Sequence, residues 1–91
     1  MFALPRISNF GGMTIVVYYN DHNPPHFHII YNEVRCRILI ESGKYMSGHQ
    51  KLPKTKEKEA LKWLELHRND IMRAWNDCRA NRVPSKIPPL Y

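Results

Sequence analysis

The segment Asn20–Tyr31, which reads NDHNPPHFHIIY, constrains the fold of this chain more than any other segment. Its two consecutive prolines, Pro24 and Pro25, fix φ and supply no amide donors. They therefore form a stiff, extended step between the apolar run before them and the apolar run after them. If the residues that follow form a strand, side chains alternate between its two faces. His26, His28 and Ile30 then lie on one face, and Phe27, Ile29 and Tyr31 lie on the other.

The same pattern predicts a β-hairpin around Asn32-Glu33. Two runs rich in β-branched and aromatic residues flank this pair, and Asn accepts the left-handed conformation that a tight turn needs. An antiparallel ladder about this turn pairs His28 with Arg37 and places Arg35 on the same face. The face that carries the histidines is therefore expected to be basic, and the opposite face is expected to form the core.

The rest of the chain predicts an α+β fold in a single domain, residues 1–91. A small antiparallel sheet of three to five strands is expected within residues 4–46, where β-branched runs alternate with Gly and Asn turns. Apolar residues at three- and four-residue spacings then predict two C-terminal helices, at about residues 54–81, packed on one face of the sheet. One longer, bent helix is the alternative, because the two apolar stripes nearly align. The proline-rich residues 83–91 predict an extended arm.

Composition and net charge limit the classes of binding partner and the cellular compartment that we expect. The net charge of +6 and the pI of about 9.6 are compatible with RNA or a small acidic protein as partner. Cys36 and Cys78 lack paired spacing, which predicts two free thiols in a reducing cytoplasm. No apolar run approaches the roughly 20 residues of a membrane span, so we expect a cytoplasmic protein that does not associate with membranes. Trp63 and Trp75 are expected to anchor the core.

Three interpretations of His22, His26 and His28 remain open. In the first, the H-x-H pair and His22 bind a metal, but the arginines expected on the same face oppose a cation, so we assign no metal ligand and no cofactor. In the second, one histidine acts as a base and another as an acid in RNA cleavage, with an arginine on the phosphate. In the third, the histidines are structural.

The second interpretation assigns a role to each candidate residue. Asp21 orients a histidine, and Tyr31 or Tyr19 stacks on a base. The catalytic candidates are His22, His26, His28 and Arg37, and the substrate-binding candidates are Asp21, Tyr31 and Arg35.

The central motif also resembles the signature N-D-H-x-P-P-H-F-H-x-x-Y of a family of small bacterial proteins that share a domain of unknown function. The segments Pro5–Gly12 and Leu61–Trp75 resemble the patterns that flank this signature, so the resemblance covers most of the chain. Members of this family are often encoded beside a second small protein. The resemblance therefore implies one half of a toxin–antitoxin pair.

Together these observations predict a toxin-like protein that acts on RNA as a metal-independent ribonuclease and is neutralised by a small acidic partner. The alternatives are a non-enzymatic interaction module, such as an antitoxin or adaptor, and a protein that binds a metal through its histidines.

Overall fold

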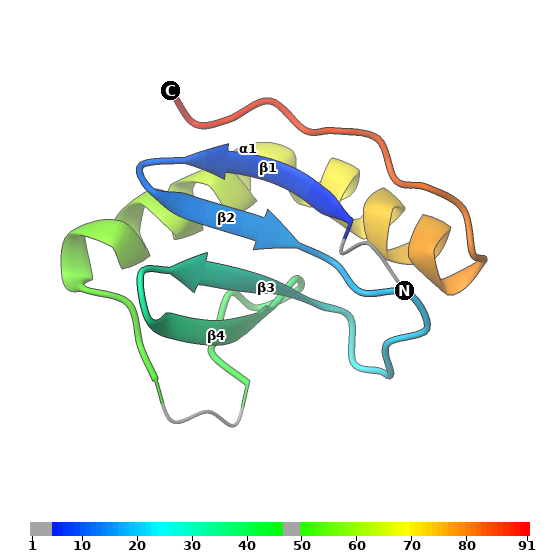
Figure 1. The fold of residues 1–91 in the computed structure, drawn as a ribbon, viewed down its shortest axis with the longest axis horizontal. Helices are drawn as coiled ribbons and strands as arrows, with labels where there is room; N and C mark the ends of the chain where they lie inside the picture. The colour runs from blue at the N-terminus through cyan, green and yellow to red at the C-terminus, as the bar shows by residue number, and fades with distance from the viewer. Residues whose placement is uncertain (1–4, 47–49) are drawn as a thin grey trace.

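The computed structural model describes residues 5–46 and 50–91 and shows an α+β fold (Figure 1). The expected first residue of the sheet, residue 4, lies outside the described residues. A four-stranded antiparallel sheet has the order β1-β2-β3-β4, so each strand pairs with its neighbour in sequence. One helix follows the sheet, and no helix in the described part of the chain is long and apolar enough to cross a membrane. The elements are β1 (Arg6–Phe10), β2 (Met13–Val16), β3 (His26–Tyr31), β4 (Val34–Leu39) and α1 (Lys54–Arg79).

The expected hairpin around Asn32 is confirmed. Asn32 has a φ of 53°, in the left-handed region that Asn tolerates. β3 and β4 pair in the expected register, with His28 opposite Arg37. Cys36 is buried while Arg35 is exposed, as the alternation requires. The arginines of β4 therefore lie on the face away from the core.

The core lies between α1 and the inner face of the sheet. Phe27 and Ile29 of β3 are fully buried on this face, and the ring of Phe27 lies 5.8 Å from that of Trp63. Trp75 is also buried, which confirms that both tryptophans belong to the core. Burying an aromatic side chain contributes about 2–3 kcal/mol. The two tryptophans therefore account for much of the attachment of α1 to the sheet.

The prediction of two C-terminal helices is wrong. The structure has a single helix, α1, with non-helical backbone angles at one residue, His67 (φ −127°, ψ 22°). A deviation at one residue bends a helix without breaking it, because the flanking turns keep their hydrogen bonds. Asn69, which follows the bend and is a residue type that often caps helices, lies inside α1. The bend lets both halves bury their apolar stripes, which include Trp63 and Trp75.

The residues after α1 run as an extended arm along β1 (Figure 1). The Ile87 amide donates to the carbonyl of Ile7 at 2.7 Å, and the Ile87 side chain is buried. The indole N–H of Trp63 donates to the carbonyl of Pro88 at 2.9 Å. The arm therefore covers an edge of the sheet and satisfies a buried polar group of the core.

Both cysteines are free and buried, and we expect them to be unreactive in the folded protein. Burial raises the pKa of the Cys36 and Cys78 thiols to about 11, so little thiolate forms near pH 8. A thiol-reactive aromatic disulfide at pH 8 should label the native protein very slowly. In denaturant the same reagent should label both cysteines rapidly. Rapid labelling of either thiol in the native state would contradict this burial.

Candidate functional site

The loop between β2 and β3 places Asp21 over the start of β3. Asn20 has a φ of 56°, a left-handed conformation that turns the chain back toward the sheet. The Asn23-Pro24 peptide bond is cis. The backbone N–H of His22 donates to Asp21 Oδ1 at 3.0 Å, which holds the carboxylate against its own loop. The second carboxylate oxygen is left to face β3.

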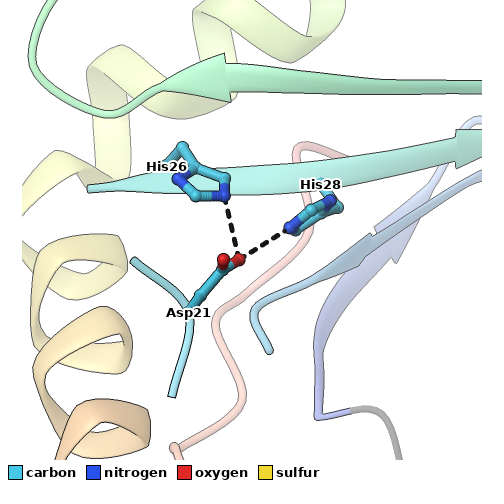
Figure 2. A group of neighbouring side chains, drawn as sticks. All are labelled: Asp21, His26 and His28. Carbon is cyan, nitrogen blue, oxygen red and sulfur yellow. Dashed lines mark hydrogen bonds and ion pairs between the residues drawn. The ribbon is translucent and has the colours of Figure 1, made fainter. Parts of the chain in front are cut away.

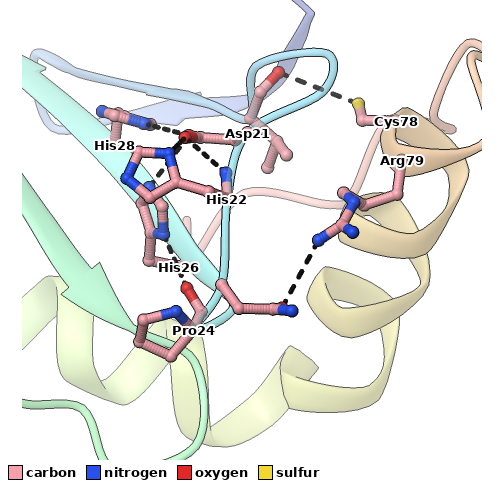
Figure 3. A network of polar contacts seen from close by, with 9 residues as sticks. Asp21, His22, Pro24, His26, His28, Cys78 and Arg79 are labelled. Carbon is pink, nitrogen blue, oxygen red and sulfur yellow. Dashed lines mark hydrogen bonds and ion pairs between the residues drawn. The ribbon is translucent and has the colours of Figure 1, made fainter.

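The far end of α1 holds this loop in place (Figure 3). The Cys78 thiol donates to the carbonyl of Val17 at 3.8 Å, and the Arg79 guanidinium donates to Asn23 Oδ1 at 3.4 Å. The same guanidinium lies 5.8 Å above the ring of Trp75. The position of the loop therefore depends on a helix that lies more than fifty residues later in the sequence.

Asp21, His26 and His28 form a cluster at the start of β3 (Figure 2). Asp21 Oδ2 lies 2.9 Å from His26 Nε2 and 3.0 Å from His28 Nε2. One ligand atom from each residue lies within 4.8 Å of the other two, so these three residues can hold a metal ion. The side chains of Asp21 and His28 are 12% and 15% exposed, whereas that of His26 is 1% exposed.

His26 is fixed on all sides. Its Nδ1 lies 2.8 Å from the carbonyl oxygen of Pro24. A carbonyl oxygen can only accept, so Nδ1 carries the hydrogen of this bond. The ring of Trp75 covers the imidazole at a centroid distance of 5.2 Å. His26 Nε2 is buried without a well-oriented hydrogen-bond partner among the described residues, although it faces Asp21.

The cluster shifts the pKa values of Asp21 and His28 downward. Burial lowers the pKa of His28, and the hydrogen bond to Asp21 opposes this shift only in part. Burial alone would raise the pKa of Asp21, but the hydrogen bonds from His28 and the His22 amide outweigh it and hold that pKa below its ordinary value. At neutral pH the carboxyl group is therefore ionised and the His28 ring is neutral.

The remaining candidate residues are distributed over the two faces of the sheet. The His22 ring is 81% exposed and lies at the rim, with Nδ1 3.4 Å from Asp21 Oδ1. Arg35 and Arg37 line an open depression of about 310 Å³ on the outer face, together with His28. Tyr31 does not join them, because it packs against the core and lies under the ammonium of a lysine, Lys56, at 5.7 Å.

Tyr18 is the site residue that sequence reasoning missed. It lines the depression, and its ring lies 4.1 Å from that of His28. Val16, the last residue of β2, pairs with His28 in the structure. Alternation continued past the end of β2 places the residue two positions later, Tyr18, on the same face, and this was the available signal. Tyr18 therefore takes the position that we expected Tyr31 to occupy.

The fold and the site together define a small α+β protein that carries two histidines and one carboxylate at the end of an antiparallel sheet. The chain belongs to the DUF4160 family, a domain of unknown function, whose model matches residues 12–76. This range includes β2, β3, β4, the whole Asp21–His26–His28 cluster and most of α1, and it leaves out β1 and the C-terminal arm. No curated protein and no solved structure matches the chain.

Proposed function

We propose that this protein acts on RNA across the outer face of β3 and β4, as the toxin-like half of a bacterial toxin–antitoxin pair. One observation carries the proposal: Arg35 and Arg37 line the same depression as His28, which contacts the Asp21 carboxylate. A phosphate held by the guanidinium groups would lie beside the cluster. The net charge of +6 favours the approach of a polyanion.

We assign different roles to the two histidines of β3, and their geometry supports this division. His26 is buried and its Nδ1 is bound to a backbone carbonyl, so it is a positioning residue. His28 is partly exposed and lines the depression, so it can contact a substrate. This division differs from the acid–base pair expected from the sequence, in which both imidazoles reach the RNA.

Tyr18 suits a single-stranded substrate. Its ring lies beside His28 on the outer face, where an unpaired base can stack on it. A base on Tyr18 and a phosphate on Arg37 would place the intervening 2′-hydroxyl next to the cluster. The cluster would then accept the proton of this hydroxyl as its oxygen attacks the phosphorus. The bond from phosphorus to the 5′-oxygen would break, the departing 5′-oxygen would take a proton from water, and a 2′,3′-cyclic phosphate would remain.

The same face is a suitable surface for a neutralising partner. An acidic protein that binds Arg35 and Arg37 would cover the depression and exclude RNA. The family resemblance described above implies a second small protein. Because this chain is basic, we expect that partner to be acidic.

Binding of a short single-stranded RNA, measured by fluorescence anisotropy at one fixed salt concentration, tests the surface. Arg35→Ala and Arg37→Ala should each weaken binding about tenfold, because each removes a charge-assisted contact worth about 1.4 kcal/mol or more. Arg73→Ala is the matched control, since this arginine is exposed on α1 and pairs with Asp70. Equal losses in all three variants would show that only net charge matters.

Induced expression in a bacterium tests the activity. The wild-type protein should slow growth and shorten cellular RNA, and His28→Ala should do neither. If the wild type is harmless and purified protein cleaves no RNA, a non-enzymatic interaction module becomes the better description.

A further inference from the structure

We infer that Asp21, His26 and His28 form a binding site for a divalent first-row transition-metal ion. The inference goes beyond the proposed action on RNA and stands on the geometry of the cluster alone. It also reverses the assignment made from the sequence, which gave no residue a metal-binding role.

The distances between the three side chains suit a metal. Transition-metal ions lie about 2.1 Å from histidine nitrogen and carboxylate oxygen, so neighbouring ligand atoms at right angles are about 3.0 Å apart. Asp21 Oδ2 lies 2.9 Å from His26 Nε2 and 3.0 Å from His28 Nε2. The three ligand atoms all lie within 4.8 Å of one another. An ion therefore fits after small side-chain movements.

The hydrogen bonding of His26 points to the same conclusion. Its Nδ1–H donates to the Pro24 carbonyl, which in the neutral ring leaves a lone pair on Nε2. This nitrogen is buried, lacks a well-oriented partner among the described residues and faces the carboxylate of Asp21. Two lone pairs that face each other in a buried site require a cation between them. A ring nitrogen bound to a backbone carbonyl, with the other aimed at the cation, is the usual arrangement of a metal-bound histidine.

A proton on His26 is the competing explanation, and it accounts for less of the geometry. A protonated His26 would pair with Asp21 and would need no second imidazole. The structure places His28 Nε2 against the same oxygen, Asp21 Oδ2, and the rings of His26 and His28 are neighbours, with centroids 5.0 Å apart (Figure 2). Three ligand atoms that converge on one point serve a metal better than they serve a single proton.

The ligand set indicates the class of metal and its surroundings. Two imidazoles and one carboxylate bind first-row transition metals and leave coordination positions for water or substrate. The exposed His22 lies beside the site and can supply a further ligand. Arg37 lies opposite His28. Its positive charge lowers the affinity of the site for a cation, but it attracts an anionic substrate to the site. A metal-bound water at this point would be the natural nucleophile or base.

Titration of chelator-stripped protein with Co²⁺ tests the site, with calorimetry for the stoichiometry and visible absorption for the ligand field. The wild type should bind one ion per chain. Asp21→Asn and His28→Ala should weaken binding at least about a hundredfold, more than the loss of a hydrogen-bonded neighbour of a ligand usually costs. His67→Ala is the matched control, because His67 lies 3.5 Å from Asp70 on α1, away from the cluster, and should bind like the wild type.

Circular dichroism shows whether each variant is folded before it is titrated. Folded wild-type protein that binds no stoichiometric Co²⁺ at millimolar concentration would overturn the inference, and so would unchanged binding in Asp21→Asn. The titration contains no RNA. The metal site and the action on RNA can therefore fail separately, and each failure is recognisable.

Discussion

Ile87→Ala is expected to lower the free energy of unfolding by about 3 kcal/mol, the middle of the range for a buried isoleucine. Ile87 belongs to an arm without regular secondary structure, but its side chain is 5% exposed and packs into the core. Its amide also fixes the arm to β1 through Ile7. Shortening this side chain should loosen the arm, and the indole N–H of Trp63 then loses its partner, the Pro88 carbonyl.

Val83→Ala is the control for this variant, because Val83 belongs to the same arm and is 81% exposed. It should change stability by no more than about 0.5 kcal/mol. Chemical denaturation followed by tryptophan fluorescence measures both variants. Equal stability of Ile87→Ala and Val83→Ala would mean that the arm does not contribute to the core in solution.

His26→Ala should destabilise the protein far more than His28→Ala when both are measured in a chelator. His26→Ala removes a buried ring that packs on Trp75 and leaves the Pro24 carbonyl without its donor, which together cost about 3 kcal/mol. His28 is partly exposed, and its removal should cost about 1 kcal/mol.

Thermal and urea denaturation of the two variants in EDTA measure this difference, and the chelator removes any contribution of bound metal. Among folded variants, His28→Ala should lose more activity on RNA than His26→Ala, and we expect it to be fully inactive. If the two substitutions cost the same stability, the two histidines have no separate structural and functional roles.

The sequence predicted the β3–β4 hairpin because two independent signals agree there. The alternation of apolar and polar residues fixes which face each side chain takes, and Asn32 marks the turn. Once the register was known, the position of Arg37 opposite His28 followed. The same alternation places Tyr31 on the core face, so its assignment to the site ignored available information.

Other features depend on contacts that no local pattern contains. The continuity of α1 past His67 depends on how both halves pack on the sheet, because a bend and a break leave similar apolar stripes. Asp21 reaches β3 because Asn20 takes a left-handed conformation and because the end of α1 holds the loop through Arg79. The convergence of Asp21, His26 and His28 was not predicted, because this carboxylate was not expected to contact both histidines.

The three residues of the cluster fall within eight consecutive positions, 21 to 28, while their cover comes from Trp75. An unfolded chain therefore keeps the three side chains close together in sequence, although it loses their fixed orientation and their cover. Some of the affinity for a cation is then present in the unfolded chain too. Such a cation raises the melting temperature less than its affinity for the folded state alone implies. The melting temperature is thus a poor measure of how much metal the proposed site holds. An isolated peptide of residues 21 to 28 should retain a measurable share of the affinity for the metal ion.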